Sequence, residues 1–228
     1  HLDCRVRMRS VLICVTLAVL GKVSATFGQG SYEDFEDGLA DGWYFPEQRI
    51  AEHEQTAAEF TVLEPGLNGS RYKYGGTEAC GSPNLLWETG TLQFDLEMPL
   101  TADGVFQVVL AYLDSSNYLL MSLHPLEAEN ATDFVQLVRD GEVSAEAGAA
   151  SSLPAGTTHH VVIARGSAQV EVYLDHGGTP RLVLANAALP GGSLPFYFCT
   201  RGEASIDNVS VTGSFEVIDS TTIHMTIP

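Results

Sequence analysis

Apolar and polar residues alternate with a period of two along most of this chain, and this period constrains its fold more than any other feature. In the run TLQFDLEM at positions 91–98, every second residue is apolar and the residues between them are polar or acidic. Because successive side chains of a β-strand point to opposite faces, such a run buries one face and exposes the other. The pattern predicts a half-buried strand of an antiparallel sheet.

Turn signals separate the alternating runs. Asp140–Gly141 lies between two of them and predicts a tight hairpin whose two central residues have positive φ. Short polar loops at Asp114–Ser116 and Arg165–Ser167 predict two more hairpins. About ten to twelve strands recur roughly every 8–12 residues, which is typical of sandwiches and barrels. We predict an all-β fold, a two-sheet antiparallel β-sandwich of the jelly-roll type.

The first 25 residues have the pattern of an export signal. A short basic start at Met8–Arg9 precedes an apolar run at Val11–Gly21, and small residues follow at Val23–Ala25. The apolar run is shorter than the about 20 residues of a membrane helix. We therefore expect cleavage after Ala25, secretion to the cell exterior, periplasm or cell surface, and no membrane span after cleavage. An uncleaved anchor is the alternative.

The 228 residues are enough for one large domain. We expect residues 1–25 to be the signal peptide with upstream residues and residues 26–213 to be the sandwich. Residues 214–228 are predicted to be a linker, an edge strand or the start of a truncated module. With 11 basic and 29 acidic residues, the formal net charge is -18. This charge repels phosphate backbones and anionic lipids, so we exclude nucleic acid and anionic membranes as partners.

Two cysteines follow the signal segment, Cys80 and Cys199. In an oxidising compartment they are predicted to form a disulfide, and the alternative is two buried free thiols.

The run GTTHHVVIARGSAQVEVYLDHGG at 156–178 resembles the laminin G-like and concanavalin A-like jelly-roll modules. In those modules a strand of the form G-x-W-H-H-V leads by a hairpin into V-x-V-Y-V-D-G. The resemblance implies a β-sandwich and covers residues 34–213. Thr158 stands where the family usually has tryptophan. Adjacent strand residues point to opposite faces, so His159 and His160 are not expected to serve one site.

Glycosidases that share this jelly roll carry their carboxylates on one strand as E-x-D-x-E or E-x-D-x-x-E. In the run QFDLE the first position is Gln93, which leaves only Asp95 and Glu97. Retaining hydrolysis needs two carboxyl groups about 5–5.5 Å apart. Residues i and i+2 of a strand are roughly 6.5–7 Å apart at the backbone, so this pair is an alternative catalytic site. A strand with two acidic residues more often simply exposes them to solvent, and the absence of the first carboxylate favours that explanation.

Sugar binding requires exposed aromatic rings. The candidates are Tyr72, Tyr74 and Trp87, and the two tyrosines share a face in the run SRYKYGG. Aromatic residues more often fill the core of a sandwich than bind a ligand.

The acidic run FEDGLADGW at 35–43 and the run IDNVSV at 206–211 resemble the two ends of calcium-binding carbohydrate-binding jelly rolls. In those modules, oxygens of the first and last strands share a structural Ca²⁺. By position the ligands here are Glu36 and Asp207. Carboxylate oxygens suit this hard cation, and a solvated acidic turn is the alternative.

These observations predict a secreted, non-catalytic recognition module whose partner is a glycan or an extracellular polysaccharide. One alternative is a glycoside hydrolase that uses Asp95 and Glu97. The other is an extracellular adhesion or structural module with a protein partner. The ligand class comes from the resemblance, because a fold does not define an activity.

Overall fold

The computed structural model describes residues 31–33, 61–63, 79–81, 83, 85–189 and 192–217. All regular elements in these ranges are strands. In chain order the strands are β1 (Ser31–Glu33), β2 (Thr61–Leu63), β3 (Ala79–Gly81), β4 (Leu85–Glu97), β5 (Val105–Asp114), β6 (Asn117–Leu123), β7 (Thr132–Arg139), β8 (Glu142–Ala150), β9 (Thr158–Arg165), β10 (Gln169–Leu174), β11 (Leu182–Ala185), β12 (Leu194–Pro195), β13 (Tyr197–Arg201) and β14 (Ala204–Val217).

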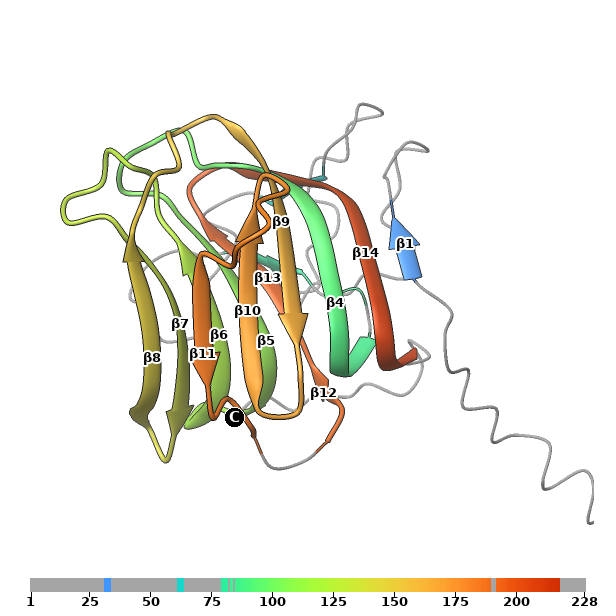
Figure 1. Cartoon of the computed structure of the whole chain (residues 1–228). Coiled ribbons are helices and arrows are strands. Elements are labelled where there is room, and N and C mark those ends of the chain that lie inside the picture. The colour runs from blue at the N-terminus through green and yellow to red at the C-terminus, as the bar shows by residue number, and fades with distance from the viewer. Residues whose placement is uncertain are drawn as a thin grey trace, which may run out of the picture.

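The strands form two antiparallel sheets that pack face to face (Figure 1). The eight-stranded sheet has the order β1-β14-β4-β9-β10-β11, with β2 beside β14 and β12 beside β4. The six-stranded sheet has the order β3-β13-β5-β6-β7-β8. The predicted two-sheet antiparallel sandwich is therefore confirmed. Neighbouring strands that are distant in sequence, such as β4 beside β14, give the crossovers expected of a jelly roll.

The predicted hairpins form at the predicted places. Asp140 (φ 52°) and Gly141 (φ 80°) are the two residues between β7 and β8, and both have positive φ. This is the geometry that matches the right-handed twist of the flanking strands. Strand β5 ends at Asp114 and β6 begins at Asn117, while β9 and β10 are joined through residues 166–168.

The inner faces of the two sheets form the core. The alternation correctly predicted the burial of Leu92, Phe94 and Leu96 in β4 and of Met98 just after it. The rings of Phe94 in the eight-stranded sheet and Phe198 in the six-stranded sheet lie 5.1 Å apart, edge to face. Phe94 also contacts Phe106 of the six-stranded sheet. Three further ring contacts extend this series: Trp87–Phe196, Phe196–Phe198 and Phe106–Phe198.

The last strand extends beyond the predicted domain boundary at residue 213. Residues 214–217 continue β14, and Ser214 pairs with Thr89 while Val217 pairs with Leu85 in β4. Residues 214–217 thus pass the predicted boundary as part of a strand, and the edge-strand alternative is the one that fits them. Near this point Gly90 and Gly213 face each other, and a Cβ on Gly90 would lie 1.9 Å from the Thr212 carbonyl oxygen.

The two predicted disulfide partners lie opposite each other. Cys199 in β13 has Cys80 in β3 as its register partner, and Cys199 is disulfide-bonded in the structure. Directly opposed residues of an antiparallel pair have Cα atoms about 4.5–5.5 Å apart. That separation is within the about 4.4–6.8 Å range of disulfide-linked residues. The bridge between Cys80 and Cys199 itself stays a prediction.

Reduction tests this bridge. We expect dithiothreitol to lower the free energy of unfolding by about 2–4 kcal/mol, because the bridge closes a long loop in the unfolded chain. Urea unfolding with and without the reductant measures the change. The double variant Cys80→Ser/Cys199→Ser is the control. Its free energy of unfolding should be the same with and without dithiothreitol. Peptide mapping that finds Cys80 and Cys199 as free thiols in the exported protein would contradict the prediction.

Candidate functional site

The acidic pair on β4 lies on the outer face of the eight-stranded sheet. Asp95 and Glu97 alternate with the buried Leu96, so the two carboxylates share one face, as predicted. Across the sheet, Asp95 has Asp207 on one side and His160 on the other as register partners. Three chemically active side chains from three strands therefore form one row.

Both carboxylate oxygens of Asp95 are held by neighbours. Asp95 Oδ1 lies 2.7 Å from His160 Nδ1, and Asn208 Nδ2 donates to Asp95 Oδ2 at 2.8 Å. Asn208 has φ 52° at an irregularity of β14 and also donates to Asp207 Oδ2 at 3.0 Å. The cluster Asp95–His160–Asp207–Asn208 thus satisfies much of its own hydrogen-bonding capacity.

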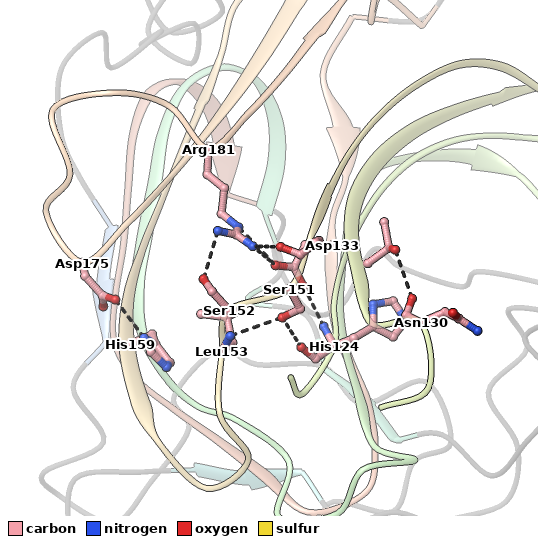
Figure 2. A network of polar contacts seen from close by, with 11 residues as sticks. His124, Asn130, Asp133, Ser151, Ser152, Leu153, His159, Asp175 and Arg181 are labelled. Carbon is pink, nitrogen blue, oxygen red and sulfur yellow. Dashed lines mark hydrogen bonds and ion pairs between the residues drawn. The ribbon is translucent and has the colours of Figure 1, made fainter. Parts of the chain in front are cut away.

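The two adjacent histidines belong to different contacts. His160 contacts Asp95, whereas His159 Nδ1 lies 2.9 Å from Asp175 Oδ2 (Figure 2). Thr157 Oγ1 is 2.7 Å from His159 Nε2, so the order hydroxyl, imidazole and carboxylate is that of a nucleophilic triad. However, the Thr157 hydroxyl also donates to the Pro154 carbonyl at 2.6 Å. That contact uses the proton which the base of a triad must remove.

The predicted calcium ligands are only partly described. Asp207 is 5% exposed and accepts from the Asn208 backbone amide at 2.7 Å, while Glu36 lies outside the described residues. Among the residues that the structure places, no group of three histidine, cysteine, aspartate or glutamate side chains has a geometry for a metal ion. The carboxylate of Asp207 and its acidic neighbour Asp95 suit Ca²⁺, so the calcium site stays a prediction.

Trp87 is not a sugar platform. Its side chain is 0% exposed and its ring contacts Phe196 in the core, so this predicted ligand-binding role was wrong. The indole is buried because Trp87, like Leu85 two residues before it, lies on the inner face of β4. Tyr72 and Tyr74 lie outside the described residues, and their predicted role is untested.

A buried ion pair joins the two sheets at one edge (Figure 2). Asp133 in β7 is 0% exposed, and Arg181, just before β11, donates to its Oδ2 through Nε at 3.1 Å and Nη2 at 2.9 Å. The other oxygen accepts from the His124 backbone amide at 3.0 Å. Removing one partner of such a pair leaves an uncompensated buried charge, which costs about 3–5 kcal/mol.

An open hollow of about 310 Å³ lies where Gly90 of β4 pairs with Arg165 of β9, at the end of these strands away from Asp95 and His160. It is lined by Gly90, Thr91, Ala164, Arg165, Gly166, Gln169 and Glu171. At its wall, Tyr173 and Gln169 donate to the two carboxylate oxygens of Glu171 at 2.6 and 2.7 Å. This hydrogen bond from Tyr173 to Glu171 raises the pKa of the Tyr173 phenol.

The outer face of the six-stranded sheet has a different character. Tyr197, Val109, Leu120 and Cys199 form an apolar cluster separate from the main core, and half-buried aromatic side chains pack against it. We call this region the aromatic face and define it by Gln107, Tyr112, Tyr118, Ser122, Phe134, Gln136 and Tyr197. Gln107, Ser122 and Tyr197 are buried, and the other four side chains are partly exposed.

The register sets these side chains in rows across the strands. Tyr112 in β5 is opposite Tyr118 in β6, and Ser122 in β6 is opposite Phe134 in β7. Gln107 donates from Nε2 to the Ser122 hydroxyl at 3.5 Å. The aromatic face therefore alternates ring faces with amide and hydroxyl groups over neighbouring strands.

The sequence analysis did not identify the aromatic face. The signal was present, because Tyr112 and Tyr118 flank the predicted Asp114–Ser116 hairpin and side chains opposite each other across a hairpin share a face. In β5, however, both faces are apolar. The sequence of such a strand does not show which of its two faces packs into the core.

Comparisons with known proteins identify the fold. No family model and no curated protein matches this chain. Among solved structures, a β-glucanase from Bacillus licheniformis is similar, with 13% identity over 81% of this chain and 98% of that chain and a TM-score of 0.59. A β-1,3-1,4-glucanase derived from a mouse hindgut metagenome has 12% identity over 81% and 99% of the chains, with a TM-score of 0.59.

The carbohydrate-binding module CBM66 from Bacillus subtilis is also similar, with 13% identity over 75% of this chain, 96% of that chain and a TM-score of 0.50. The fold is a concanavalin A-like jelly roll. At these identities the similarity shows the fold alone, and it does not decide between glycan binding and catalysis. In the described ranges, no helix is long and apolar enough to cross a membrane.

Acid is expected to destabilise the protein partly through His124. Burial is the main cause that lowers the pKa of His124 below its ordinary value of 6.5, and the nearby Asp133 opposes this effect. The folded state then binds its proton less readily than the unfolded state. Stability from this group is complete above pH 6.5 and declines as the pH falls below that value.

Chemical unfolding between pH 7.5 and pH 5 measures this effect. We expect the free energy of unfolding of the wild type to fall over this range and that of His124→Gln to fall less. The backbone contacts of His124 with Asp133 and Ser151 are retained in the variant. An equal decline in both proteins would exclude His124 as a source of the acid sensitivity.

Thermal melting with Ca²⁺ and with a chelator tests the metal prediction. A cation that binds only the folded state raises the midpoint, so we expect a higher midpoint in Ca²⁺ that is lost in Asp207→Asn. Asp175→Asn, which changes an exposed carboxylate of the same sheet, is the control. An identical midpoint with and without Ca²⁺ removes Glu36 and Asp207 from the candidate ligands.

Proposed function

We propose that this protein is a secreted, non-catalytic glycan-binding module and that the glycan lies on the aromatic face. The observation that supports the proposal most is the alternation of rings and amides across β5, β6 and β7. Half-buried Tyr118 and Phe134 offer apolar ring surfaces, and Gln136 lies two residues beyond Phe134 on the same face of β7. The apolar faces of a sugar ring can stack on the aromatic rings, and its hydroxyl groups can hydrogen-bond with the amide.

Charge supports a glycan in preference to an acidic polymer. The seven residues that define the aromatic face are all uncharged, and the chain as a whole carries a net charge of -18. Such a field repels nucleic acid and other polyanions. An uncharged polysaccharide meets no such repulsion, and its hydroxyl groups can hydrogen-bond with the half-buried Gln136.

The residue pattern of the aromatic face argues for binding without turnover. Retaining and inverting glycosidases both require a pair of carboxyl groups at the scissile bond. On β6 the outward positions are Tyr118, Leu120 and Ser122, which carry no carboxylate. The whole sequence also contains neither E-x-D-x-E nor E-x-D-x-x-E.

A glycoside hydrolase is the second candidate, with its site on the opposite face of the molecule. Asp95 and Glu97 share the outer face of β4, and the names of most similar structures describe glycoside hydrolases and transglycosylases. Against this candidate, His160 and Asn208 contact both oxygens of Asp95, which limits its access to a sugar carbon.

Binding to a glycan array tests the first proposal. We expect Tyr118→Ala and Phe134→Ala to weaken binding about tenfold each, because loss of one aromatic contact costs about 1 kcal/mol or more. Tyr173→Ala removes a tyrosine from the outer face of the other sheet and is the matched control. Binding that survives both aromatic-face variants and is lost in the control would place the glycan elsewhere.

Release of reducing sugar from β-glucans tests the second candidate. The proposal predicts no release by the wild type at enzyme concentrations that saturate the glycan. Release that disappears in Glu97→Gln, with the fold unchanged by circular dichroism, would replace the binding module with a hydrolase that uses Asp95 and Glu97. Glu171→Gln, on the same sheet face, controls for a change of surface charge.

A further inference from the structure

Two described asparagines have the N-x-[ST] pattern of N-glycosylation acceptors. They are Asn130, followed by Ala131 and Thr132, and Asn208, followed by Val209 and Ser210. A third, Asn68, lies outside the described residues. The sequence pattern does not distinguish the two described asparagines. In the structure, Asn130 is exposed, whereas Asn208 is partly buried.

Asn130 is presented to solvent by an ordered loop. It is exposed, lies between β6 and β7, and has a left-handed φ of 56°. Thr132 donates from its hydroxyl to the Asn130 carbonyl at 3.1 Å, so the two essential residues of the pattern already contact each other. Figure 2 shows the Asn130 side chain pointing away from the polar network of His124 and Asp133. An added sugar would therefore extend into solvent.

The loop that carries Asn130 is fixed on both sides. The Ala131 amide donates to the Ala128 carbonyl at 3.2 Å, and the Ser151 amide donates to the Ala131 carbonyl at 2.9 Å. These bonds use backbone groups only. A modification of the Asn130 side chain therefore breaks none of them.

Asn208 is used inside the fold. Its Nδ2 donates to Asp95 Oδ2 at 2.8 Å and to Asp207 Oδ2 at 3.0 Å, which occupies both amide hydrogens. A sugar on Nδ2 replaces one of these hydrogens and adds a bulky group between two strands. Losing a hydrogen bond to a partly buried carboxylate costs about 1.5–3 kcal/mol before any steric cost is counted.

We propose that Asn130 is an N-glycosylation site of this protein and that Asn208 is unmodified in the folded chain. In the reaction, Asn130 Nδ2 forms a bond to the anomeric carbon of a lipid-pyrophosphate-linked oligosaccharide. The bond from that carbon to the pyrophosphate oxygen breaks with its electron pair, the lipid pyrophosphate leaves, and Nδ2 loses one proton. The transferase and the lipid-linked donor are those of a eukaryotic secretory pathway. The proposal is independent of the glycan-binding function.

Expression of the full chain behind a eukaryotic secretion leader tests the proposal. Peptide mapping of the secreted protein, with and without an amidase that removes N-linked glycans, measures occupancy at each asparagine. We expect a glycan on Asn130 and none on Asn208. Thr132→Ala should abolish the glycan on Asn130, while Thr132→Ser should retain it, because serine keeps the hydroxyl group that the pattern requires.

Two controls separate modification from folding. Asn130→Gln is expected to be secreted with the same melting midpoint as the enzymatically deglycosylated wild type, because the side chain is exposed. Chain produced in bacteria provides the unmodified mass. An unmodified Asn130 in the eukaryotic product, whether secreted or retained, overturns the proposal, and so does a folded product that carries a glycan on Asn208.

Discussion

The two sheets are held together by a series of aromatic contacts, and the rest of the structure depends on that contact between layers. Phe94 from β4 lies against Phe106 and Phe198 of the opposite sheet, and Phe196 connects this group to Trp87. Each such pair adds about 0.5–1.5 kcal/mol to the burial of the rings. Because side chains alternate, fixing these inner residues also fixes which residues of every strand face outward.

The two outer faces that result are chemically different. On the eight-stranded sheet, His160 and Asn208 each contact one oxygen of Asp95, so this carboxylate is held by its neighbours. On the six-stranded sheet, the aromatic face combines rings with an amide, as Tyr118 and Gln136 show, and the exposed Glu146 of β8 lies opposite Gln136. The aromatic face adds the partly exposed rings of Tyr118 and Phe134, which the cluster around Asp95 lacks. This difference is why the aromatic face is the better candidate for glycan binding.

Local patterns were enough to predict the strands and turns, because these depend on nearby residues. The period of two located β4, and Asp140–Gly141 located a hairpin with positive φ at both positions. Contacts between distant residues were not predictable in this way. Asp95 meets His160 across 65 positions of sequence. Trp87 is held in the core through its pairing with Phe215 of β14 and Leu194 of β12, which lie far away in the sequence.

The predicted roles of Glu36, Tyr72 and Tyr74 concern residues outside the described ranges, and they remain predictions from sequence. The cysteine prediction differs, since Cys80 and Cys199 are opposed in the register although 119 positions separate them in sequence. The oxidising compartment suggested the pair, and the antiparallel register of β3 and β13 supplies the geometry that a bridge requires.

Mapping of amide chemical shifts during titration with an oligosaccharide from the glycan array is the most direct test of whether a glycan binds on the aromatic face. It reports the location of the ligand without any substitution. If the glycan binds there, the shifted signals belong to β5, β6 and β7, with the largest changes near Tyr118, Phe134 and Gln136. Shifts confined to β4 and β9, around Asp95 and Glu97, would contradict it.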